Sequence, residues 1–157
     1  MQEPFILFQV AGTTYALPSA QVLQVEMLSE VTRVPNAPPF VDGVVYVRGR
    51  VVPVVDLRTR FGFERRPYDI KTRLLVVELG TRWVGLVTDS ARDFILLDSD
   101  DIQPPPTDAL SLQAAYVVGV FVRQENLLLV LDIRRLLDAD EQQSLAEVPQ
   151  AANEAPA

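Results

Sequence analysis

Short hydrophobic runs recur along the chain, and glycine, proline or polar residues bound each of them. Runs of about 4–8 residues that are rich in Val, Ile and aromatic residues, with such boundaries, are typical of β-strands. Several neighbouring runs are separated by only a few turn-forming residues, which favours β-hairpins. The predicted strands span residues 5–10, 13–17, 44–47, 51–55, 73–79, 82–88, 93–97, 116–123 and 127–131. The pattern therefore predicts an all-β fold.

The stretch Gly43–Gly62, GVVYVRGRVVPVVDLRTRFG, contains the clearest hairpin signal. Arg48 and Gly49 separate two valine-rich runs, and a glycine readily adopts the positive φ that a tight hairpin turn requires. Pro53 lies within the second run. Because proline has no amide hydrogen to donate, it favours an edge or bulged position in the sheet.

Two aspartates stand where helix N-caps are expected. Asp56 precedes residues 57–61, which can form one or two helical turns before Gly62 ends them. Asp132 precedes a segment that predicts a final helix running to about Ala146. Both aspartates are therefore predicted to be structural caps.

The hairpin pattern occurs twice. Gly43–Gly62 returns without a gap as Gly119–Leu137, GVFVRQENLLLVLDIRRLL, so that Gly119 stands 76 positions after Gly43. A weaker similarity relates Ile6–Leu17 to Leu74–Gly85, with an offset of 68 positions. The same order of both similarities favours two related β units. These units span roughly residues 5–62 and 73–137.

Other segments give weaker signals. Residues 19–28 predict a short helix or an irregular strand with Ser19 as N-cap, and residues 31–34 predict a further short strand. Residues 99–113 are acidic and interrupted by proline, which predicts a long loop. Residues 148–157 are mostly Ala, Pro, Glu, Gln and Asn, which predicts a disordered acidic tail.

Composition and length limit the function. The 157 residues fit one domain, here residues 1–147, or two small units that share a core. The absence of His and Cys excludes thiol nucleophiles, imidazole bases and zinc or haem sites built on those ligands. A net charge of −7 argues against nucleic-acid binding. No apolar run could span a membrane and no signal peptide is evident, so we expect a cytoplasmic protein without direct membrane insertion.

Four motifs carry a resemblance to a known family: YALPSAQVLQV (Tyr15–Val25), VDGVVYVRGRVVPVVDLRTRFG (Val41–Gly62), GLVTD (Gly85–Asp89) and LVLDIRRLL (Leu129–Leu137). With them, the chain resembles the CheW-like family of chemotaxis coupling proteins over roughly residues 5–140. The resemblance implies two interleaved five-stranded SH3-like β-barrels with short helices and a C-terminal helix. It implies an adaptor without enzymatic activity, cofactor or metal.

The resemblance also implies partners. These are the regulatory domain of a CheA-type histidine kinase, the cytoplasmic tip of a methyl-accepting chemoreceptor, and other CheW-like domains in rings. Five residues match family positions around a groove that takes the receptor helix: Ile6, Ser19, Val22, Val25 and Ala91. An apolar groove that receives a helix is a known recognition mode. The alternative is ordinary core packing, because any such fold buries valines.

Arg48 is the first candidate for a contact with the kinase or the receptor. A guanidinium at a turn tip presents five donors that can bind carboxylates or carbonyls. Tyr46 stands where the family commonly has a small amide, and Gly49 is expected to serve backbone geometry rather than contact. The alternatives for Arg48 are a solvated tip or an internal salt bridge to Asp56 or Glu78.

Other interpretations stay open. The protein could serve a pilus, twitching-motility or other chemosensory-type pathway, or it could be a carboxylate-based hydrolase that uses Asp56 or Asp89 as acid or base. An acidic cluster favours a solvated loop over a cation site; it comprises Asp98, Asp100, Asp101 and Asp108. A basic patch either balances local acids or meets an acidic partner; it comprises Arg58, Arg60, Arg65 and Arg66.

Overall fold

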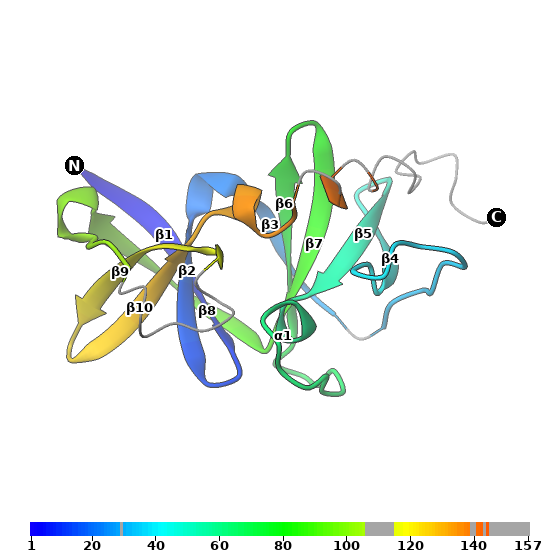
Figure 1. Ribbon diagram of the computed structural model, residues 1–157, viewed down its shortest axis with the longest axis horizontal. Helices are drawn as coiled ribbons and strands as arrows, with labels where there is room; N and C mark the ends of the chain where they lie inside the picture. The colour runs from blue at the N-terminus through cyan, green and yellow to red at the C-terminus, as the bar shows by residue number, and fades with distance from the viewer. Residues whose placement is uncertain (29, 106–114, 139–140, 143, 145–157) are drawn as a thin grey trace.

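Two curled five-stranded sheets lie side by side along the long axis of the molecule (Figure 1). This computed structural model describes residues 1–28, 30–105, 115–138, 141–142 and 144. The strands are β1 (Gln2–Val10), β2 (Thr13–Pro18), β3 (Val22–Met27), β4 (Gly43–Val47), β5 (Arg50–Asp56), β6 (Arg73–Leu79), β7 (Arg82–Thr88), β8 (Ser90–Asp98), β9 (Val117–Arg123) and β10 (Asn126–Leu131). The helical segments are η1 (Ser19–Gln21), α1 (Leu57–Arg60), η2 (Ser99–Asp101) and η4 (Ile133–Arg135). The prediction of an all-β fold with two five-stranded SH3-like barrels is confirmed.

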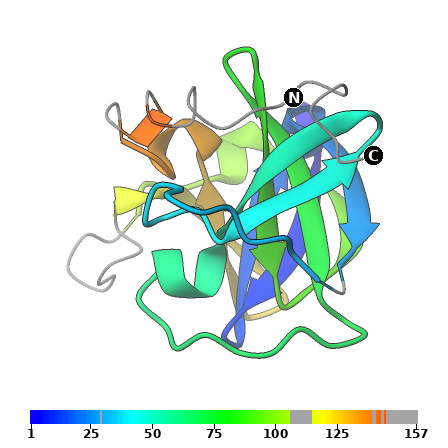
Figure 2. The same cartoon turned by 90° about the vertical axis from the view of Figure 1, so that its right-hand side faces the viewer.

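Each sheet curls into a barrel. The first barrel has the strand order β8-β1-β2-β10-β9, and the second barrel has the order β3-β6-β7-β5-β4, seen in front in Figure 2. Each barrel also contains one isolated β-bridge. The bridge joins a residue that follows one edge strand to a residue of the edge strand on the other side of the sheet. Thr32 follows β3 and pairs with Val44 of β4, while Gln103 follows β8 and pairs with Val120 of β9. The bridges close the barrels and cover strand edges that would otherwise stay unpaired.

The two barrels are interleaved along the chain: the first combines β1 and β2 with β8, β9 and β10, and the second is formed by the continuous segment β3 to β7 that lies between them. The chain crosses from the first barrel to the second through η1, between β2 and β3. It returns through a single residue, Asp89, between β7 and β8. In each barrel, three antiparallel strands join an antiparallel pair through one parallel pairing, which is β2 with β10 in the first barrel and β5 with β7 in the second.

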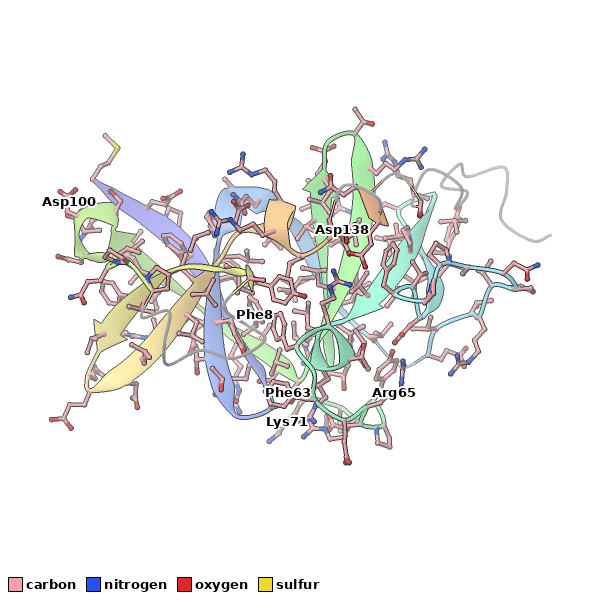
Figure 3. All side chains as sticks on the ribbon, viewed as in Figure 1. Phe8, Phe63, Arg65, Lys71, Asp100 and Asp138 are labelled. Carbon is pink, nitrogen blue, oxygen red and sulfur yellow. The ribbon has the colours of Figure 1, made fainter. Side chains whose placement is uncertain are left out.

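The largest hydrophobic cluster lies between the barrels and takes side chains from both. Its aromatic residues form a row: Phe8 of β1 stacks on Tyr15 of β2, with ring centroids 5.8 Å apart. Phe61, which follows α1, lies 5.0 Å from Tyr15 and 5.5 Å from Tyr116. Figure 3 places Phe8 in the middle of the molecule, where the two sheets meet. Because the main core is shared, we expect the barrels to unfold together.

Most predicted strands agree with the observed ones to within a few residues, but the connections differ. Residues 31–34 form no strand and contribute only the Thr32 bridge. The predicted loop 99–113 begins with η2, because the Asp98 carboxylate accepts from the Asp100 amide at 3.0 Å, and it continues with the Gln103 bridge. Residues 106–113 lie outside the described part of the chain.

The prediction of one continuous helix from Asp132 to Ala146 is wrong. The Asp132 carboxylate accepts from the Arg134 amide at 2.9 Å, but the segment that it caps is only η4. The chain bends at Leu136 and Leu137, whose side chains are buried in the shared core. Helical conformation returns at residues 141, 142 and 144. The rest of this predicted helix and the predicted tail, 148–157, lie outside the described residues.

Two further local predictions are wrong. Ser19 is not an N-cap, because Pro18 holds that position of η1 and no side chain caps it; the following segment is the strand β3. Pro53 lies in β5, an interior strand without a bulge. The sheet tolerates the proline because β5 pairs with β7 only from Val54 onward, so the missing amide falls where β5 has one neighbour.

The N-cap of α1 carries a measurable part of the stability. The Asp56 carboxylate accepts from the Arg58 amide at 2.9 Å, which satisfies one of the otherwise unpaired donors of the first turn. We expect Asp56→Ala to lower the free energy of unfolding by about 1 kcal/mol, measured by urea denaturation. Asp56→Asn keeps the acceptor and should stay close to wild type. Equal losses in both variants would contradict a capping role.

Candidate functional site

The turn between β4 and β5 presents a charged side chain to solvent. Arg48 and Gly49 both have positive φ, 47° and 79°, as a two-residue hairpin turn of this hand requires. Arg48 is exposed and makes no ion pair with any described residue, so neither Asp56 nor Glu78 is its partner. Tyr46, which lies on β4 two residues before Arg48, is 60% exposed.

The turn borders a shallow cavity of about 350 Å³ between the two edge strands of the second barrel. β3 lines one side with Glu26 and Met27, and Met27 is 72% exposed. Tyr46 and Arg48 line the other side. The cavity thus combines exposed apolar side chains with charges of both signs, which suits a protein partner better than a small reactive substrate.

The five groove candidates divide between core and surface. Ile6 is 2% exposed and belongs to the shared core, while Val22 and Ala91 are partly buried and pack against the same core. Val25 is exposed on β3 beside Leu23 and Met27, and Ser19 is half-buried at the first crossing between barrels. The structure therefore brings Ile6, Val22 and Ala91 together at one cluster, with Ser19 beside Val22 along the chain and Val25 further along the edge strand.

A group of charged side chains surrounds α1 and the second crossing between barrels. The guanidinium of Arg58 donates from Nε and Nη2 to the Asp89 carboxylate, at 2.8 Å and 2.9 Å. The Ala11 amide donates to the same carboxylate at 2.8 Å. Arg65, labelled in Figure 3, makes a second bidentate pair with Asp42, at 2.6 Å and 2.9 Å.

The remaining two arginines of the predicted basic patch are also paired. Both terminal nitrogens of Arg60 donate to Glu141, one of them at 2.7 Å. Arg66 lies 3.6 Å from Asp89 and 3.9 Å from Asp69. All four arginines thus have acidic neighbours, so the patch balances local acids. Glu141 could not be recognised as the partner of Arg60 from the sequence, because 81 residues separate the two.

Two aspartates in this group have shifted pKa values of opposite direction. Burial raises the pKa of Asp56, and the Arg58 amide offsets this only in part. For Asp89, burial opposes the charged form, but the hydrogen bonds from Arg58 and the Ala11 amide outweigh it and hold its pKa below the usual value. Burial also raises the pKa of the nearby Tyr68 hydroxyl to about 12.

These contacts explain both carboxylates that the hydrolase hypothesis used. Asp89 is fixed by an arginine and a backbone amide, which favours a permanently charged carboxylate over one that exchanges protons. Asp56 is buried as a helix cap. Among the described residues, no three acidic side chains converge on a possible metal position, and Asp98 instead pairs with the Met1 ammonium at 3.2 Å. Asp108 lies outside the described residues. No described helix has the length and apolarity to cross a membrane.

Fold and site together define a protein made of two interleaved SH3-like β-barrels, with an exposed arginine turn on one barrel and partly buried apolar side chains where the barrels meet. A family model, CheW-like domain, matches residues 4–141, and the chain belongs to this family of chemotaxis adaptor and scaffold proteins.

Individual relatives agree with this assignment. The chain is 33% identical to "Chemotaxis protein CheW" of Klebsiella aerogenes over 139 residues, which cover 88% of this chain and 84% of that protein. It is 31% identical to "Protein FrzA" of Myxococcus xanthus over 147 residues, which cover 92% and 91%. The crystal structure of scaffolding protein TtCheW from Thermoanaerobacter tengcongensis superposes with a TM-score of 0.79 at 27% identity, covering 90% of this chain and 91% of that one.

Proposed function

We propose that the protein is a cytoplasmic, non-enzymatic adaptor that couples methyl-accepting chemoreceptors to a CheA-type histidine kinase in a chemosensory array. The observation that carries this proposal is the match of the CheW-like model to residues 4–141, which takes in both barrels. The contacts of Asp56 and Asp89 add support, because they account for both carboxylates that the hydrolase hypothesis used. Rings with other CheW-like domains fit the same proposal.

The receptor contact is assigned to the surface where the two barrels meet. Val22 and Ala91 come from different barrels and pack on one core, and both are only partly buried. Ser19 and Val25 extend this surface along the first crossing and β3. Ile6 lies beneath and is expected to support the floor. A helix that covers this surface would bury apolar side chains of both barrels at once.

The kinase contact is assigned to the exposed turn of the second barrel. Arg48 has no intramolecular ion pair among the described residues, so its guanidinium is available to a partner carboxylate or carbonyl. Tyr46 offers a large apolar ring with a polar tip, a residue type that is enriched in protein interfaces. Gly49 keeps the turn geometry.

A second candidate function is the same adaptor role in a pilus, twitching-motility or other chemosensory-type pathway. This candidate is supported by the 31% identity to FrzA, which is close to the 33% identity to the chemotaxis protein CheW of Klebsiella aerogenes. The two candidates differ in the receptor and kinase that bind, not in the surfaces used.

Binding of the purified protein to the regulatory domain of each CheA-type kinase of the source organism tests the proposal. We expect micromolar affinity by calorimetry, as for interfaces of modest size, and a loss of at least about tenfold with Arg48→Ala. The turn should survive, because Ala11 has a similar φ, 50°, in the turn between β1 and β2.

Gln124→Ala is the matched control. Gln124 is the first residue of the β9–β10 turn with φ 52°, so it has the same conformation in the other barrel. Retained binding in Arg48→Ala would move the turn to the receptor contact or to a structural role. A lack of binding to every kinase and receptor of the organism would remove the proposed function and leave the fold.

A further inference from the structure

The chain connects strands of the two barrels at two crossings, and one of these crossings is built around a charged contact. Asp89 is the single residue between β7 of the second barrel and β8 of the first. Its amide donates to the Gln9 carbonyl at 2.9 Å, and its carboxylate accepts from the Ala11 amide at 2.8 Å. Both bonds join Asp89 to the β1–β2 hairpin of the first barrel.

The other half of the contact comes from the second barrel. Arg58 lies on α1, directly after β5, and its guanidinium binds both oxygens of Asp89. Arg58 is itself held, because its Nη1 donates to the Glu64 carbonyl at 3.2 Å. The side chains of Arg58 and Asp89 are only 17% and 16% exposed. Bidentate arginine–carboxylate pairs fix orientation as well as distance, and burial reduces screening by salt.

We propose that Arg58 and Asp89 form a positioning pair that sets the angle between the two barrels, and with it the width of the candidate receptor groove. Ala91 stands two residues after Asp89, and it pairs with Phe8 on β1. Val22, on the opposite barrel, directly follows η1 at the other crossing. A change in the angle at Asp89 would therefore alter the spacing between Ala91 and Val22. The assignment of the receptor groove rests on the proposed function. The claim that the pair sets the angle between the barrels does not depend on it.

Spin-label distance measurements on the free protein test the pair directly. The chain has no Cys, so labels can be placed at Thr81→Cys in the β6–β7 turn and at Asn126→Cys at the start of β10. Both positions are exposed, and they lie on different barrels. We expect one narrow distance in the otherwise unaltered protein, a broad distribution in Arg58→Ala, and an unchanged β-sheet circular dichroism spectrum.

Arg65→Ala is the matched control, because it breaks a bidentate pair of the same chemistry whose two residues both flank elements of the second barrel. The distribution of distances between the two labels should stay narrow in Arg65→Ala. If Arg58→Ala fails to fold, Asp89→Asn gives the same reading, since the amide can still accept from Ala11 but loses the charge that Arg58 binds. A folded Arg58→Ala or Asp89→Asn with the unaltered narrow distance would overturn the proposal. Because no partner is present, this result is independent of whether a kinase or receptor binds.

Discussion

Replacing Gly43 by alanine is expected to destabilise the protein strongly, although only one methyl group is added. A Cβ at this position would lie 2.3 Å from the Thr32 carbonyl oxygen and 2.6 Å from Cγ1 of Val31. The Thr32 carbonyl cannot move away without breaking its hydrogen bond with the Val44 amide, 2.7 Å, which closes the second barrel. The φ of Gly43, 157°, adds backbone strain for any other residue.

We expect Gly43→Ala to lower the free energy of unfolding by about 3 kcal/mol or more, measured by urea denaturation, because overpacking and backbone strain act together. Gly80→Ala is the control. Gly80 also has a positive φ, 64°, but a Cβ there would meet no atom within 4 Å. It should lose only about 1 kcal/mol, the strain part alone. Equal losses in the two variants would show that the close approach of Thr32 has no effect.

Gly43 also explains why the sequence similarity with an offset of 76 positions corresponds to a structural similarity. Gly43 and Gly119 are related by the offset of 76, and each directly precedes a residue of a closing bridge, Val44 or Val120. A Cβ at Gly119 would lie 2.4 Å from Cγ2 of Ile102, beside the Gln103 bridge. A glycine is needed wherever the closing segment crosses the first strand of a hairpin, so this position could be predicted from the repeat.

The offset of 68 describes the other hairpins less well. The β1–β2 turn consists of Ala11 and Gly12, both with positive φ, whereas the β6–β7 turn begins with Gly80. Gly12 is therefore the second residue of its turn, whereas Gly80 is the first residue of its turn. The offset of 68 aligns the two hairpins with an error of one residue. Identical residue types do not identify equivalent positions where the turn conformations differ.

Strands and hairpins could be predicted because their signals are local: short hydrophobic runs, glycine in the turn, and a capping aspartate. The positioning contacts could not. Arg58 and Asp89 are 31 residues apart, and Arg60 and Glu141 are 81 apart. Nothing in their own neighbourhoods distinguishes them from solvated charges. Asp89 comes to lie against α1 only because the chain leaves β7 of the second barrel and enters β8 of the first barrel at this residue.

The second large effect is expected at Phe61, which is 2% exposed and lies between Tyr15 and Tyr116 in the aromatic row. Phe61→Ala should lower the free energy of unfolding by about 3–5 kcal/mol, because it removes a buried ring and leaves a cavity that its neighbours cannot fill. Phe94→Ala is the control: Phe94 is 66% exposed on β8, and its loss should fall within about 0.5 kcal/mol.

Two probes show whether this cavity affects one barrel or both. The single tryptophan, Trp83, lies on β7 of the second barrel, so its fluorescence reports that barrel, while circular dichroism reports the strands of both. Because Phe61 contacts Tyr15 of the first barrel from the end of α1, the two urea midpoints should fall by the same amount. A fluorescence midpoint that stays at the wild-type value while the dichroism midpoint falls would mean that the barrels unfold independently. The shared aromatic row would then fill space between the barrels without coupling their stabilities.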